Sequence, residues 1–287
     1  YIRPMEQGDF ILLCTDGLVN TVADQEMLFE VVHGGDLDTC LDRLLHISKN
    51  RRFGVQEKRM SDGKITIKSE SQRALMRAAG ELTGRTLNYI ETLIKPGIST
   101  KELDEAAEEF IRSHGAVPSF LNYEGFPASI CTSVNDRIVH GIPSRHDRLR
   151  DGDIISVDCG ALLNGFHGDA ARTFLVGNVA PEVAKLVQVT KECFFKGLEQ
   201  AVVGNHISDI GRAIQQHAES HGYGVVRELV GHGIGMNMHE APEVPNYVIP
   251  HFGRGARLVP GMAIAIEPMI NLGTRRIRVL DDGWTCV

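Results

Sequence analysis

Four side chains in this sequence have the chemistry of ligands for a divalent cation. His232 stands between glycines in Gly231-His232-Gly233-Ile234-Gly235, and Glu267 precedes a proline. Two aspartates lie upstream, at Asp158 and Asp169. One imidazole with several carboxylates is a hard, mostly oxygen ligand set, which suits Mn, Fe(II), Co or Zn in a hydrolytic centre better than a structural zinc site. These residue types therefore predict a metallohydrolase.

Turn chemistry predicts that the two aspartates share one β-hairpin. A strand-like run ends at Asn164-Gly165, the favoured pair for a two-residue type I′ turn. Counting outward from the turn puts Gly160 opposite Asp169. We expect Asp158 opposite Arg172 and on the same face as Asp169. Diagonal neighbours lie about 7–8 Å apart, so both carboxylates could reach a shared pair of cations across a space that Gly160 leaves open.

Each of these residues also has an ordinary interpretation. Aspartates on a hairpin are usually exposed charges, glycines around His232 can mark only a tight turn, and Glu267 could end a strand at the surface. The ligand interpretation is favoured for Asp158 because its strand is mostly apolar, and a buried carboxylate is costly unless it is paired or bound to metal.

Five short strings follow one another between about residue 64 and the C-terminus: Asn135 to Pro143, Val157 to Gly160, Gly165 to Asp169, Gly231 to Gly235 and Ile266 to Met269. Together they resemble type I methionine aminopeptidases in order and spacing. The resemblance implies an α+β class and the pita-bread fold, in which paired helices back an antiparallel sheet with pseudo-twofold symmetry.

The resemblance also implies roles for individual residues. Four side chains would bind two divalent metal ions, drawn from Co, Mn, Fe or Zn: Asp158, Asp169, His232 and Glu267. Asp169 would bridge the two ions, and Glu267 would also take a proton from the attacking water. His239 resembles the family histidine that stabilises the tetrahedral intermediate, and His140 the one that hydrogen-bonds the substrate near the scissile amide nitrogen.

A substrate pocket for a methionine side chain is implied in the same way. Its apolar, polarisable lining would suit a thioether and comprises Phe120, Tyr123, Phe126, Cys131, Met238 and Trp284, with His140 and His239 at the scissile bond. Aromatic residues with this spacing are usually ordinary core. The position of the segment just before His140 favours the pocket.

One departure from the resembled family concerns a fifth metal ligand. The family has a second bridging glutamate on a later strand, whereas this sequence ends at Val287. We expect the aminopeptidase domain, residues 64–287, to lack its last strand or strands. Weak or absent turnover is expected, since losing a bridging carboxylate weakens metal binding. Normal hydrolysis of a methionyl peptide with added Mn or Co would contradict this expectation.

The N-terminal residues 1–49 resemble a different family. The string from Gly8 to Asn20 is similar to the late signature of PPM-type serine/threonine protein phosphatases, in which the aspartate of Asp16-Gly17 binds a metal. The other acidic pairs of such phosphatases find no match, so we expect an inactive fragment, or simply a buried strand before a turn. Residues 50–63 are polar without periodicity and are predicted to form a linker.

Hydrophobic periodicity and capping signals predict the remaining elements. We expect one helix over residues 69–94 and a second that begins at a Ser99–Glu102 capping box and ends before Gly115. Two more helices are expected over 181–203 and 208–221. Strands should dominate 129–176 and return near Met262 and Ile277.

Composition restricts the class of protein and its compartment. The chain has 287 residues, and its hydrophobic content of 43% is ordinary for a globular protein. Its net charge of -7 argues against a generic nucleic-acid binder. Apolar runs are too short to span a membrane, and six scattered cysteines indicate a reducing cytosol. We expect a cytoplasmic monomer that acts on N-terminal Met peptides and nascent chains, including at the ribosome, without direct contact to nucleic acid or membrane.

Three functions remain open at this point. The first is an aminopeptidase that removes initiator methionine. The second is another pita-bread hydrolase of the prolidase type. The segment from Phe120 to Cys131 disfavours this function, because it matches the methionine pocket. A comparison of Met-Ala with X-Pro substrates would distinguish the first two functions. The third is a non-catalytic pita-bread binding module, against which two tightly held metal ions per chain would count.

Overall fold

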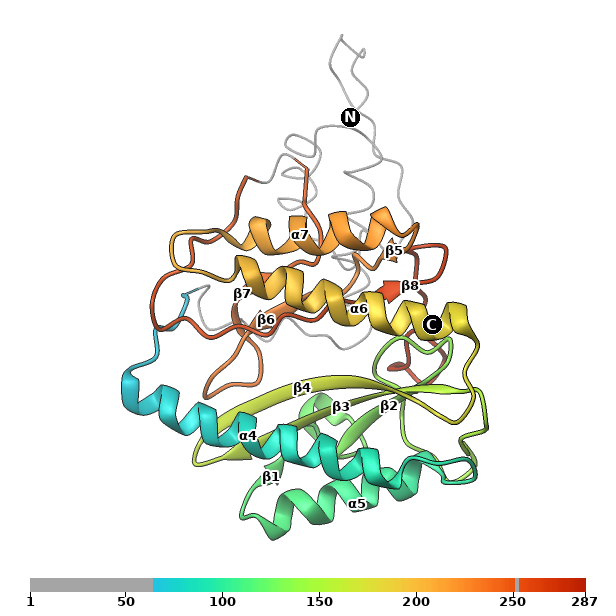
Figure 1. Ribbon diagram of the computed structural model, residues 1–287. Coiled ribbons are helices and arrows are strands. Elements are labelled where there is room, and N and C mark those ends of the chain that lie inside the picture. Colours follow the sequence, from blue (N-terminus) through green and yellow to red (C-terminus); the bar gives the residue numbers. More distant parts are fainter. Residues whose placement is uncertain (1–63, 251–252) are drawn as a thin grey trace, which may run out of the picture. The chain divides into compact units, whose positions relative to one another are not determined.

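The computed structural model describes residues 64–250 and 253–287 (Figure 1). The predicted phosphatase-like fragment 1–49 and the predicted linker 50–63 lie outside the described residues, so both stay predictions. All described helices and strands belong to one compact unit, formed by residues 59–248 and 254–287.

Two helices open the described part of the chain, α4 (Glu70–Leu93) and α5 (Thr100–Ser113). Each begins with a capping box, in which the N-cap serine and the side chain of the third helical residue bond each other's backbone N–H groups. The pair at the start of α5 is Ser99 and Glu102, as predicted. Both helices therefore begin where local sequence chemistry places them.

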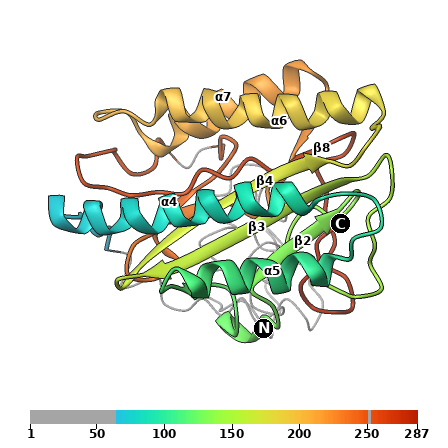
Figure 2. The same ribbon diagram turned by 60° about the horizontal axis from the view of Figure 1, so that its bottom comes forward.

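An antiparallel sheet forms the centre of this half of the fold. The central strand β3 pairs with three neighbours, and the four strands are β1 (Val117–Pro118), β2 (Ile130–Val134), β3 (Ile154–Leu163) and β4 (Phe166–Leu175). Helices α4 and α5 pack against the sheet (Figure 2). Ile155, Val157, Cys159 and Ala161 of β3 are buried in the core with them, so the alternate residues of β3 face away from these helices.

The β3–β4 hairpin has the predicted turn. Asn164 and Gly165 both have positive φ, 53° and 81°, as a type I′ turn requires at its two central positions. Leu163 pairs with Phe166 directly before and after this turn. The turn therefore sets the register of the whole hairpin.

The register confirms one predicted pair and corrects the other. Gly160 lies opposite Asp169, as expected. Asp158 lies opposite Ala171 and not opposite Arg172. The prediction was wrong by one residue, because the partners along a regular hairpin move by equal steps away from the turn. Both aspartates still share one face, since side chains alternate along each strand.

The second half of the fold repeats the order of two helices followed by strands. Helix α6 packs on α7, and α7 contacts two of the strands. These elements are α6 (Pro181–Gln200), α7 (Ile207–Ser220), β5 (Gly224–Val225), β6 (Gly231–Gly233), β7 (Glu240–Val244) and β8 (Ile270–Asn271). Strand β5 pairs with β8, and β6 with β7.

The strands predicted near Met262 and Ile277 are much shorter than expected. An isolated bridge joins Gly233 to Ile264, and another joins Val279 to Cys286. The segment from Met262 to Glu267 is extended but is held by single contacts rather than by a continuous ladder. Within 64–250 and 253–287, no helix is both long and apolar enough to cross a membrane.

Helix α4 lies directly on β4 at one glycine. A Cβ atom added to Gly168 would stand 2.6 Å from the carbonyl of Ala79, a distance that helix backbone cannot relieve by a side-chain rotation. The absence of a side chain at this position therefore sets the spacing between helix and sheet.

We predict that Gly168→Ala lowers the free energy of unfolding by about 1–3 kcal/mol, because the helix must shift from the strand. Urea denaturation measures this change. The control is Gly84→Ala within α4, where an added Cβ meets nothing within 4 Å and should raise stability by about 0.5–1 kcal/mol. An unchanged midpoint for Gly168→Ala would show that the contact is not as tight as described.

Candidate metal centre

Three of the four predicted metal ligands converge in space. Asp169, His232 and Glu267 each offer one ligand atom, and these atoms lie within 4.8 Å of one another. His232 Nε2 is 3.5 Å from Asp169 Oδ2 and 3.1 Å from Glu267 Oε1. The side chains of His232 and Asp169 are each 9% exposed. Residues from three separate parts of the sequence thus meet in a largely buried space.

Asp158 stands beside this group of three. Its carboxyl group lies close enough to that of Asp169 for each to influence the pKa of the other. Burial raises the pKa of Asp158 well above its usual range, and the nearby charges of Asp169 and Glu267 raise it further. Burial also raises the pKa of Asp169, more than the hydrogen bond from His232 lowers it. Adjacent buried carboxylates resist carrying several negative charges, and a divalent cation removes this penalty.

The glycines on either side of His232 allow two other backbones to approach. An added Cβ at Gly231 would stand 2.4 Å from the carbonyl oxygen of Ala265, and one at Gly233 would stand 2.2 Å from that of Ala241. The glycines therefore serve close packing of strand β6, and not only a tight turn. His232 Nδ1 donates to the carbonyl of Gly233 at 2.8 Å, which leaves Nε2 facing the carboxylates.

Two hydrogen bonds hold the backbone at Glu267 and just before it. The amide of Ala265 donates to the carbonyl of His232 at 2.6 Å, and Asn246 Nδ2 donates to the carbonyl of Glu267 at 2.6 Å. Among the described residues, no group except the His232 ring lies in position to interact with the buried Oε1 atom of Glu267. This oxygen is therefore oriented toward the centre of the site.

These residues fit a divalent cation. Carboxylates and one imidazole are the donor set that Mn, Fe(II), Co and Zn share. The Nδ1 hydrogen bond to a carbonyl orients the His232 ring, as second-shell partners of metal-bound histidines do. A buried carboxylate oxygen facing only that ring is a natural ligand atom. Asp169, His232 and Glu267 together could hold a cation, with Asp158 next to them.

Both predicted catalytic histidines lie at the edge of this site. The ring centroid of His239 is 4.2 Å from that of His232, and Tyr123 Oη is 2.7 Å from His239 Nδ1. His140 has a positive φ of 58°, a strained backbone conformation that costs about 1–3 kcal/mol and is frequent at functional sites. Burial lowers the pKa of His140, although the charge of Asp169 opposes the shift, so its ring is neutral at pH 7.

The predicted pocket residues form one apolar cluster. Four of the six predicted residues are buried, at 8% exposure or less, and the other two are partly buried and pack against them. The cluster also contains two residues that the sequence analysis did not identify, Ala128 and Ile142. The six predicted members are Phe120, Tyr123, Phe126, Cys131, Met238 and Trp284. The rings of Phe126 and Trp284 meet edge to face at 5.1 Å. We call these eight residues the apolar pocket cluster.

The space above Gly160 is filled rather than open. A Cβ added to Gly160 would stand 2.7 Å from Ser119 Cβ and 2.9 Å from the ring of Phe120. The expectation of an open space was wrong, because the segment before the pocket folds over the strand. The consequence is that Phe120 packs over the residue that pairs with Asp169, while Cys131 pairs with Asp158. The apolar pocket cluster therefore adjoins the strand positions of both aspartates.

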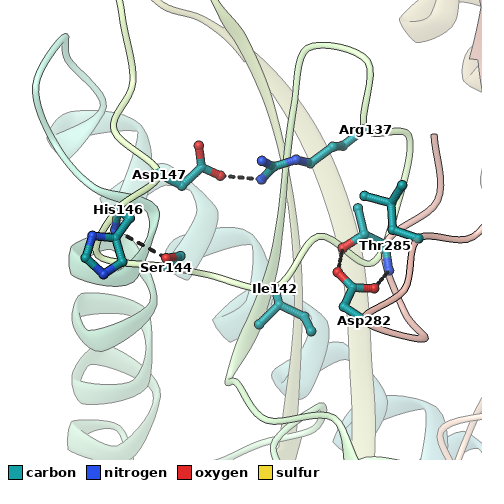
Figure 3. Close-up of a pocket in the computed structure, with 8 residues that line it drawn as sticks. Arg137, Ile142, Ser144, His146, Asp147, Asp282 and Thr285 are labelled. Carbon is teal, nitrogen blue, oxygen red and sulfur yellow. Dashed lines mark hydrogen bonds and ion pairs between the residues drawn. The ribbon is translucent and has the colours of Figure 1, made fainter.

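A cavity of about 340 Å³ shares one lining residue with the apolar pocket cluster (Figure 3). Ile142 lines this cavity and also packs on the cluster. On one side Arg137 pairs with Asp147. On the other, Asp282 accepts hydrogen bonds from the backbone N–H groups of Trp284 and Thr285, each at 2.8 Å. The Asp282 turn therefore fixes the backbone at Trp284, and the main polar groups of the cavity pair with one another.

The fold and the site together define a metallopeptidase of the pita-bread type. The family model described as metallopeptidase family M24 matches residues 74–285. This chain belongs to that family.

Individual relatives agree with the family assignment. The chain is 57% identical to a methionine aminopeptidase from Clostridium acetobutylicum over 223 residues, 78% of this chain and 88% of that protein. A crystal structure of methionine aminopeptidase from Rickettsia prowazekii is 43% identical, with a TM-score of 0.75, and covers 78% of this chain and 90% of that chain. A structure of an Xaa-Pro dipeptidase from Bacillus anthracis is 26% identical, with a TM-score of 0.61, over 70% of this chain and 54% of that chain.

We predict that a divalent cation binds more tightly as pH rises from 7 toward 10 and that about one proton or more is released per chain. Burial lowers the pKa of His232, but attraction to Asp169 and Glu267 outweighs burial and raises it to about 10. At pH 7 the ring therefore carries a proton that a cation at Nε2 must displace.

Titration calorimetry with MnCl2 in two buffers of different ionisation enthalpy measures the released protons. His232→Gln, which lacks this proton, provides the control and should release fewer. Equal affinity at pH 7 and pH 9 would contradict the prediction.

Proposed function

We propose that this chain is a metal-dependent aminopeptidase that removes the N-terminal methionine from newly made proteins. The observation that carries the proposal is the direct contact between two different sites. Phe120 of the apolar pocket cluster lies over Gly160, which pairs with Asp169, and Cys131 of the cluster pairs with Asp158. A methionine side chain in the cluster would therefore hold its own peptide bond beside the metal ligands.

We further propose that two divalent cations bind here, drawn from Co, Mn, Fe or Zn. Their ligands would be Asp158, Asp169, His232 and Glu267. Asp169 is central to this set because its carboxyl group interacts with both Asp158 and His232. When bound, such a pair of cations supplies a water of lowered pKa and polarises the scissile carbonyl.

The chain's own residues would position the substrate and move protons. Glu267 faces the site with a buried oxygen and would accept a proton from the attacking water. His239 would hydrogen-bond the oxygen of the tetrahedral intermediate, with its ring oriented by Tyr123 Oη. His140, neutral because burial lowers its pKa, would accept a hydrogen bond from the scissile amide N–H.

The apolar pocket cluster supplies selectivity for methionine. Its aromatic rings and the thioether of Met238 are polarisable surfaces, and a substrate sulfur near an aromatic ring contributes about 0.3–1.5 kcal/mol. In an X-Pro substrate the residue that would enter the cluster is X, and the proline follows the scissile bond, so the cluster provides no preference for proline. The cluster therefore favours methionine removal over a prolidase-like activity, although the Xaa-Pro dipeptidase shares the fold.

The substrate would be a peptide or nascent chain with an N-terminal methionine, met in the cytoplasm and also at the ribosome, and the enzyme would act as a monomer. The net charge of -7 supports a role that needs no direct contact with nucleic acid. A non-catalytic binding module is the alternative, and two tightly held metal ions per chain would count against it.

We predict that the chain hydrolyses Met-Ala-Ser about a hundredfold faster than Leu-Pro at equal concentration and saturating Mn2+, because only methionine fills the apolar pocket cluster. The ratio of the two rates, measured by release of the free amino acid, does not depend on the absolute activity. A ratio near one, or in favour of Leu-Pro, would sink the proposed specificity.

His239→Ala is expected to lower kcat for Met-Ala-Ser about 10²–10³-fold with KM changed less than about threefold, since its hydrogen bond forms in the transition state. Tyr123→Phe should lower kcat by a smaller factor, because it only orients the ring. Tyr89→Phe, which removes a hydroxyl from an exposed face of α4, is the matched control. A rise in KM with unchanged kcat in His239→Ala would assign His239 to ground-state binding instead.

A further inference from the structure

A buried ion pair joins the segment before α4 to the residue after His239. Lys68 Nζ lies 2.7 Å from Glu240 Oε2, with side-chain exposures of 5% and 3%. Thr66 Oγ1 donates to the same carboxylate oxygen and accepts from Lys68 Nζ. Burial raises the pKa of Glu240, but the hydrogen bonds from Lys68 and Thr66 outweigh burial and lower it. The carboxylate is therefore charged.

The second oxygen of Glu240 closes a loop. Glu240 Oε1 accepts from the backbone N–H of Asn237 at 3.2 Å, and the N–H of Gly235 donates to the carbonyl of Asn237 at 3.1 Å. We call residues 235–240 the His239 loop. Met238 is 2% exposed within the apolar pocket cluster, so this loop carries one residue of the pocket and one of the proposed catalytic histidines.

The ion pair packs against the backbone on both sides. A Cβ added to Gly235 would stand 2.7 Å from both Glu240 Oε1 and Lys68 Cε, so only glycine leaves room for the pair there. The N–H of Lys68 donates to the carbonyl of Gly261 at 2.8 Å. The N–H of His167 donates to the carbonyl of Gly235 at 2.9 Å. In Figure 1 the blue segment before α4 rises toward the part of the fold with β6 and β7.

Stability alone is a weak reason for two buried charges. Desolvation of such a pair consumes much of the attraction between the charges, and apolar replacements of equal volume often stabilise a protein as much or more. The pair does provide one fixed geometry, because the carboxylate of Glu240 accepts hydrogen bonds from three defined donors. These are Lys68, Thr66 and the backbone N–H of Asn237. Here that geometry joins Lys68 to the His239 loop.

We propose that Lys68 and Glu240 are positioning residues, whose buried ion pair holds the His239 loop so that His239 and Met238 face the substrate. Neither residue need touch the substrate. This inference rests on the proposed function for its kinetic consequence, but the order of the loop can be measured without activity.

The experiment compares Lys68→Met, Glu240→Gln and the double variant in the full chain. Hydrogen–deuterium exchange, followed by mass spectrometry on the cation-free protein, reports the amides of residues 235–241. Each single variant is expected to exchange there at least about tenfold faster than the parent chain. With Met-Ala-Ser, each should lower kcat about tenfold or more while KM changes less than threefold, and the double variant should lose no more than the worse single variant.

Two controls separate positioning from general stability. Arg145→Met removes an exposed ion pair with Glu105, whose side chains are 76% and 50% exposed, and should change neither readout. Ile111→Val, at a fully buried core position of α5, should lower the melting temperature without faster exchange in the His239 loop.

If Lys68→Met and Glu240→Gln exchange at the parent rate in residues 235–241, or keep kcat within twofold while the melting temperature falls, the positioning role is wrong. Glu240→Gln keeps the side-chain volume and decides the question if Lys68→Met fails to fold. Failure of the parent chain both to bind Mn2+ and to hydrolyse a methionyl peptide would refute the proposed function instead, and the exchange data would still test the loop.

Discussion

Negative charges held close together in a buried space constrain this structure more than any other feature. Asp158 and Asp169 lie close enough to influence each other's pKa, and Glu267 and His232 complete the group. Such an arrangement is costly without a positive charge at its centre. The surrounding backbone is built to keep it: the β3–β4 hairpin presents the aspartates on one face, and the glycines of β6 let three backbone segments pack together beside His232.

The site gains its selectivity because a second, apolar surface adjoins the charged one. Gly160 makes this possible, since any side chain there would displace Phe120 from its place over the strand. The methionine side chain and the scissile bond could then be bound within one continuous surface. Binding of the methionine side chain thus depends on apolar residues, and hydrolysis depends on charged ones. The two groups adjoin each other at Gly160.

Local signals explain what could be predicted from the sequence. The Asn164-Gly165 turn and the Ser99–Glu102 capping box act over a few residues, and both form as expected. The motifs of the resembled family also named residues that the fold brings together. Their roles in binding and catalysis remain predictions, and Asp158 stands beside the tight group of ligand atoms rather than within it.

Features that depend on distant contacts could not be predicted. Lys68 and Glu240 are separated by 172 positions, and neither carries a local signal of burial or pairing. The filled space above Gly160 depends on how a loop folds over the sheet, which strand periodicity does not reveal. The extended segment before Glu267 lacks a ladder because isolated bridges and the side chain of Asn246 hold it.

The decisive measurement is an anomalous difference map from a crystal of this chain equilibrated with MnCl2. The proposed site predicts anomalous density within bonding distance, about 2.0–2.3 Å, of Asp169, His232 and Glu267, with Asp158 at a neighbouring ion. An empty site at millimolar Mn2+, or density bound only elsewhere on the chain, would contradict the metal centre and, with it, the peptidase mechanism.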